Sequence, residues 1–103
     1  MKFLTFTVTD MAKVPEVAQV SDKVWASPPP GIKVEANYVC LSPPFPGVSP
    51  NTLVSIAIVD AESAEAIAAT SYPMMLAGAN IHRVPLLELP VGGAAKVEKK
   101  YRG

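Results

Sequence analysis

The stretch that decides the fold runs from Leu53 to Gly78 and reads LVSIAIVDAESAEAIAATSYPMMLAG. Its first seven residues, 53–59, are almost all apolar and rich in Val and Ile, which is typical of a strand buried on both faces. An Ala- and Glu-rich run follows and favours a helix to about Ser71, with Asp60 placed to cap its N-terminus. Pro73 is expected to break this helix or to start a second short turn over residues 74–76. The stretch therefore predicts a strand that leads into a helix, as in a small sandwich of sheet and helices.

Four further segments show regular periodicity on either side of this unit. Residues 2–9 and 32–41 alternate between apolar and polar side chains, which predicts two strands. Residues 14–25 carry apolar side chains at helical spacing, and the proline-rich turn that follows ends this helix. Residues 81–89 form the last predicted strand, and Pro85 inside it favours an edge position or a bulge.

The order strand, helix, strand, strand, helix, strand predicts an α+β protein of the ferredoxin-like βαββαβ type. This arrangement has a four-stranded antiparallel sheet with two helices on one face. The other face of the sheet is then bare, although the strand at 53–59 is apolar on both sides. Two sheets packed face to face would cover it, so we expect a homodimer.

The composition agrees with one small domain that has apolar surface to cover. The chain has 103 residues, of which 50% are hydrophobic and only 17% are charged. Residues 1–91 carry a net charge of −3 and are assigned to the ferredoxin-like domain. Residues 92–103 carry +3 and are expected to form a basic, mobile tail.

Several classes of partner and cofactor are not expected. The body has no basic face, so nucleic-acid binding is not expected, and no apolar run is long enough for a membrane span. No signal peptide is evident, which favours a cytoplasmic protein. Cys40 is the single cysteine, so no intramolecular disulfide or thiolate metal cage can form. No sequence feature indicates a metal or another cofactor.

The opening MKFLTFTV, the segment PPGIKV at 29–34 and the junction VDAES at 59–63 resemble a family of small prokaryotic domains of unknown function. The segment 72–76 and the Val84-Pro85 pair fit the same family, and the resemblance covers residues 1–90. This family is similar to the dimeric α/β-barrel superfamily. The resemblance implies a ferredoxin-like homodimer with a cavity between sheet and helices. The superfamily includes cofactor-independent monooxygenases and isomerase-like enzymes, so it implies no particular reaction.

Five side chains are candidates for a site. His82 is the only histidine and could act as a proton acceptor, or it could be an ordinary edge-strand residue. Tyr72, Tyr38, Asn37 and Trp25 could place polar groups in a mostly apolar pocket, or they could serve packing alone. Alternation puts Tyr38 on the same face as the other apolar residues of 32–41.

Three functions are compatible with this sequence, and it does not decide whether the protein is an enzyme. The first is a homodimeric α/β-barrel protein that binds a small apolar ligand between sheet and helices. The second is a cofactor-independent monooxygenase or isomerase-like enzyme acting on an aromatic or lactone substrate, with His82 as base. The third is a structural or regulatory protein that presents its proline-rich loop, residues 42–51, or its basic tail to another chain.

Overall fold

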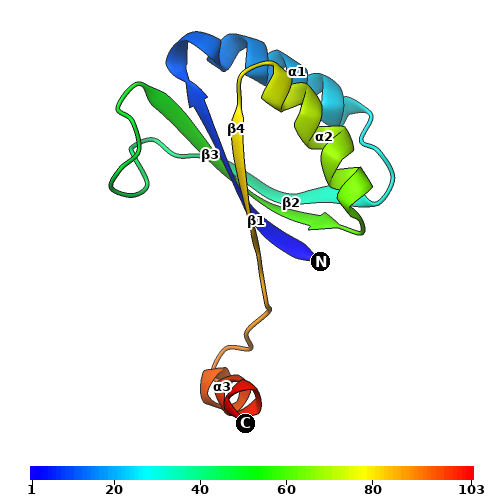
Figure 1. The fold of residues 1–103 in the computed structure, drawn as a ribbon, viewed down its shortest axis with the longest axis vertical. Coiled ribbons are helices and arrows are strands. Elements are labelled where there is room, and N and C mark those ends of the chain that lie inside the picture. Colours follow the sequence, from blue (N-terminus) through cyan, green and yellow to red (C-terminus); the bar gives the residue numbers. More distant parts are fainter.

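The computed structural model describes all residues from 1 to 103. Figure 1 shows a twisted sheet with two helices packed side by side across one of its faces. The elements in chain order are β1 (Lys2–Asp10), a 3-10 turn (Met11–Lys13), α1 (Val14–Ala26), β2 (Ile32–Val39), β3 (Thr52–Ala61), α2 (Ala64–Leu76), β4 (Asn80–Pro85) and α3 (Ala94–Arg102).

The four strands form one antiparallel sheet in the order β2-β3-β1-β4. This is an α+β architecture compatible with a ferredoxin-like fold, as the sequence predicts. Strand β4 lies at the edge of the sheet, which is where Pro85 can be accommodated because no further strand needs its missing N–H. The predicted edge position is therefore confirmed, but the strand predicted over 81–89 ends at Pro85, which is its last residue and not an internal one.

The strand registers decide which side chains face the helices. On β1 and β3, Thr5 pairs with Ala57 and Thr7 pairs with Ser55, and these odd-numbered positions face α1 and α2. The even-numbered positions face away from the helices. We call this second surface the open face; it comprises Leu4, Phe6, Val8, Tyr38, Val54, Ile56, Ile58, His82 and Val84.

Strand β2 differs from the simple alternation that its sequence suggests. A β-bulge lies between Val34 and Ala36, so that Val34 pairs with Val59 but Ala36 pairs with Ile58. The extra residue shifts the alternation by one position. The prediction that Tyr38 shares a face with Val34 is therefore wrong, and Asn37 takes the helix-facing position instead.

Helix α2 begins later and ends later than the sequence suggests. Its N-cap is Ser63, whose Oγ accepts a hydrogen bond from the Ala66 N–H at 3.1 Å. Asp60 still belongs to β3 and forms an ion pair with the chain's amino terminus at 3.2 Å. The helix also continues through Pro73 to Leu76. The predicted cap at Asp60 and the predicted break at Pro73 are both wrong.

Burial explains why α2 tolerates its proline. Thr70, Ser71 and Met74 lie on the side of the helix that packs against the sheet, and all three are buried. The proline removes one backbone hydrogen bond within the last two turns, while the side chains on both sides of it keep their packing. Tertiary contacts therefore outweigh the local preference of the sequence.

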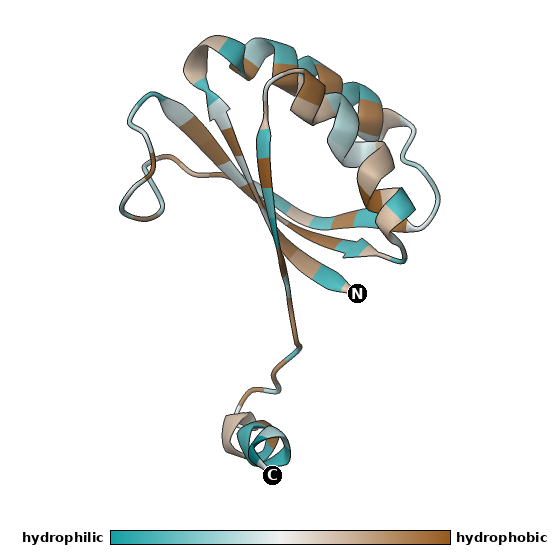
Figure 2. Ribbon diagram, viewed as in Figure 1, coloured by the Kyte–Doolittle hydropathy of each residue, from teal (hydrophilic) through white to brown (hydrophobic).

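The C-terminal tail contains a helix that the sequence did not predict. Helix α3 stands apart from the sandwich in Figure 1, and none of its residues is buried. Figure 2 shows many polar positions along α3 and hydrophobic positions along the central strands. Neither α3 nor any other helix is long and apolar enough to span a bilayer.

The buried core consists of two separate clusters between the sheet and the helices. One contains Val17, Met74, Ala77 and Ala79. The other contains Ile32, Val59, Ala61 and Ala66, with Trp25 packed against it. Only 13 of the 103 residues are buried, and the two clusters share no member.

Candidate functional site

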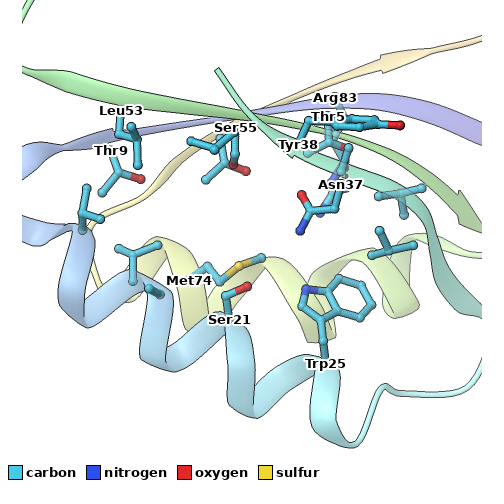
Figure 3. Close-up of a pocket in the computed structure, with 18 residues that line it drawn as sticks. Thr5, Thr9, Ser21, Trp25, Asn37, Tyr38, Leu53, Ser55, Met74 and Arg83 are labelled. Carbon is cyan, nitrogen blue, oxygen red and sulfur yellow. Dashed lines mark hydrogen bonds between the residues drawn. The ribbon is translucent and has the colours of Figure 1, made fainter. Parts of the chain in front are cut away.

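A cavity of about 240 Å³ lies between the sheet and helix α1, with Met74 of α2 also on its wall. Figure 3 shows lining side chains from the sheet on one side of this space and from the helices on the other, with the ring of Tyr38 lying along the strands and its hydroxyl pointing away from the space. The lining residues are Thr5, Thr7, Thr9, Val14, Val17, Ala18, Ser21, Trp25, Val34, Asn37, Tyr38, Val39, Leu53, Ser55, Ala57, Val59, Met74 and Arg83.

The cavity exists because the middle of the sheet carries small or polar side chains where a core would carry large apolar ones. One row of paired residues crosses all four strands and reads Asn37, Ala57, Thr5 and Arg83. The next row includes Ser55 and Thr7. Across the gap, α1 contributes the small side chains of Ala18 and Ser21. The short side chains of the sheet do not reach those of α1, so the gap between the two clusters stays open.

Arg83 is the only positively charged residue of the lining. Its Nη1 donates a hydrogen bond to Oγ1 of Thr5 at 2.9 Å, and its Nη2 donates one to Oγ of Ser71 at 2.6 Å. Both hydroxyl groups belong to buried residues. The guanidinium is therefore held between β1 and α2, with its position set from both layers of the fold.

The electrostatic surroundings of Arg83 are unusual for an arginine of a folded protein. Burial lowers the pKa of its guanidinium, and no nearby carboxylate opposes this effect. The three ion pairs of the structure join other groups. Because an arginine remains protonated in proteins, a half-buried positive charge faces the cavity without a negative partner.

The cavity opens to solvent between α1 and β2. Ala18 on the helix and Asn37, Tyr38 and Val39 on the strand all line the cavity and are themselves exposed. The side chain of Asn37 points down into the space and toward Trp25, as Figure 3 shows.

Three of the five candidate residues from the sequence lie at this cavity. Trp25 and Asn37 point into it, and Tyr38 borders it although its register assigns it to the open face and its side chain is 64% exposed. Tyr72 lies on the outer side of α2, is 63% exposed and does not line the cavity. The structure therefore does not bring Tyr72 to the other three.

His82 lies on the open face, on the opposite side of the sheet from the cavity. It borders a separate hollow together with Phe6, Val8 and Phe45 of the proline-rich loop. The rings of Phe6 and Phe45 meet edge to face, with their centroids 5.7 Å apart. His82 therefore cannot act on a molecule bound in the cavity.

The sequence analysis missed the residues that define the cavity's chemistry, namely Arg83 and the stripe of Thr5, Thr7 and Ser55. In the sequence, each of these residues is simply a polar residue among the apolar residues of a predicted strand. Alternation already placed the threonines of β1 on one side, but only the strand registers show that this side faces the helices and meets Arg83. No group of three or more His, Cys, Asp or Glu side chains is placed to hold a metal ion.

Comparison with known proteins adds no assignment: no family model matches the chain, and no curated protein matches it either.

Proposed function

We propose that the protein binds a small, mostly apolar molecule in the cavity between its sheet and its helices. The observation that carries the proposal is the cavity itself, which occupies the position where the two core clusters would otherwise join. Small-molecule sites are typically concave, largely apolar spaces with a few polar groups. Eleven of the eighteen lining residues are hydrophobic, which fits this description.

A cavity-filling substitution tests the proposal. Ala57 lies at the centre of the polar row, so Ala57→Leu should occupy the space and abolish binding. The matched control is Ala69→Leu, the same exchange at an exposed position on α2 that does not line the cavity. Native mass spectrometry of the purified protein would detect a bound small molecule. Emission of Trp25, the only tryptophan, would report the entry of added probes.

The expected result is an adduct, or a probe-dependent change in Trp25 emission, that Ala69→Leu retains and Ala57→Leu loses. An adduct that persists unchanged in Ala57→Leu would contradict the proposal. So would the absence of both an adduct and any probe that alters Trp25 emission.

We further propose that the binding protein is a homodimer whose subunits pack through their open faces, as the resemblance to dimeric α/β barrels implies. Two features of the open face support its packing against a second copy of the chain. The centre of the open face is apolar, with Leu4, Phe6, Ile56 and Ile58 only half-buried in the single chain. Its ends carry charges of both signs, which suits a patch that pairs with itself about a two-fold axis.

Light scattering at micromolar concentration tests the dimer. Ile58→Glu would place a charge in the apolar centre of the interface and is expected to give a folded monomer. Leu76→Glu is the control, because Leu76 is 84% exposed at the end of α2 and does not belong to the open face. A monomeric parent protein, or an Ile58→Glu variant that remains a dimer, would contradict this part of the proposal.

A further inference from the structure

The positive charge of Arg83 sets a requirement on whatever occupies the cavity. A guanidinium has five N–H donors, and hydrogen bonds to Thr5 and Ser71 use two of them. The remaining donors have no partner within the protein. None of the lining residues is an Asp or Glu, so the cavity contains a cation and no anion.

The strand registers place Arg83 at one end of a row of residues that crosses the sheet beneath the cavity. Arg83, Thr5, Ala57 and Asn37 are paired across neighbouring strands, and strands lie about 4.8 Å apart. The backbones of Arg83 and Asn37 are therefore about 14 Å apart. Ala57 has the smallest side chain in the row and leaves the space between them free.

We propose that the natural ligand is a small organic monocarboxylate whose carboxylate pairs with Arg83 and whose apolar body lies over Ala57 toward Asn37 and Trp25. This inference rests on the proposed function, because it specifies the ligand class of the same cavity. The guanidinium fork matches a carboxylate in shape and charge, and such pairs form two parallel hydrogen bonds.

Charge favours a monocarboxylate over a phosphate ester, and the volume of the cavity favours a small molecule. A single arginine neutralises one negative charge, and no lysine, second arginine or histidine lines the cavity to neutralise another. The volume of about 240 Å³ is below the range of about 300–1,000 Å³ that is usual for sites of drug-sized ligands. The apolar wall formed by Val17, Val59 and Met74 would contact the rest of such a molecule.

The test measures binding of four carboxylates and of their neutral amides. Acetate, butyrate, benzoate and phenylacetate are compared with the corresponding amides and with inorganic phosphate, by Trp25 emission and by equilibrium dialysis. The amides match the carboxylates in shape and lack the charge. At least one carboxylate is expected to bind about tenfold or more tightly than its amide, as expected for a charge-assisted hydrogen bond.

Arg83→Met is expected to remove this preference, so that each carboxylate binds no more tightly than its amide. Arg102→Met is the matched control, because Arg102 is the only other arginine and lies exposed on α3. Ser71→Ala keeps the charge of Arg83 but removes its link to α2. It should retain the preference for carboxylates, whereas a merely structural role of Arg83 would make Ser71→Ala and Arg83→Met similar. Arg83→Lys keeps the charge without the fork and should retain part of the preference.

The remaining outcomes separate this inference from the proposed function. Amides that bind as tightly as carboxylates, with binding lost in Ala57→Leu, would overturn the carboxylate ligand and leave the binding cavity standing. Phosphate binding without carboxylate binding would overturn the ligand class. Carboxylate binding that Arg83→Met leaves intact would overturn the role of Arg83. Failure of every probe to bind would overturn the carboxylate ligand, and it would overturn the binding function as well if native mass spectrometry detects no adduct.

Discussion

Replacing the hydroxyl group that holds Arg83 should destabilise the protein by a predictable amount. Thr5 is 5% exposed, and its Oγ1 accepts the hydrogen bond from Nη1 of Arg83 at 2.9 Å. Thr5→Val keeps the shape of the side chain and removes the acceptor. The strand supplies its own control, because Thr9 lies on the same face of β1, is 4% exposed and makes no side-chain hydrogen bond.

The size of the effect follows from the charge and the exposure of Arg83. A hydrogen bond to a charged group is worth about 1.5–3 kcal/mol when one partner is removed. Arg83 is only half-buried, so water entering the cavity can replace part of the lost bond, and we expect the low end, about 1.5 kcal/mol. Thr9→Val loses no bond and should stay within about 0.5 kcal/mol of the parent protein.

Urea unfolding followed by circular dichroism and Trp25 emission measures both variants. In a domain of this size the difference corresponds to a decrease of roughly 6–12 °C in Tm. A double-mutant cycle with Arg83→Met isolates the pair: once the guanidinium is gone, Thr5→Val should cost almost nothing. Equal losses for Thr5→Val and Thr9→Val, or an undiminished loss in the Arg83→Met background, would refute the reasoning.

Two further predictions concern the ends of β1 and α2. Ser63→Ala should lower the free energy of unfolding by about 1 kcal/mol and Ser63→Asp should restore it, because Asp also caps helices. Asp60→Ala should lower the free energy of unfolding by less in the same urea titration, since it removes only an exposed ion pair. A larger loss for Asp60→Ala than for Ser63→Ala would assign the cap to Asp60. The hydrogen bond and the charge of Glu35 raise the pKa of Lys2. The resulting stability is present below the ordinary pKa of lysine and is lost as the pH rises through the raised value, so unfolding at alkaline pH should show this loss in the parent protein and not in Glu35→Gln.

The sequence was sufficient for the order of the elements because their signals are local. The apolar run at 53–59 and the proline-rich turn after α1 depend on neighbouring residues only, and the structure confirms the strand and helix that they predict. The errors arose where a distant contact decided between two local options. Asp60 and Ser63 are both good capping residues, but pairing with β2 extends β3 to Ala61 and so leaves the cap to Ser63.

The site was harder to predict because it depends on register. The bulge between Val34 and Ala36 turns Asn37 toward the helices, and no sequence pattern in β2 marks it. Arg83 was recognisable only as a charge next to His82. The two residues lie on opposite faces of the sheet, and pairing with Thr5 brings the arginine to the cavity.

The cavity and the modest core have the same physical origin. At the end of the sheet where Val34, Val59 and Phe3 meet, large apolar side chains fill the layer and form a cluster. In the middle rows the same helix-facing positions hold Thr7, Ser55 and Ala57. These side chains are too small or too polar to fill the space between sheet and helices. A core optimised for stability alone would carry Val or Leu there, since each buried CH₂ contributes about 0.8 kcal/mol. Stability is thus lost in the rows that accommodate Arg83, a loss that the proposed binding function would explain.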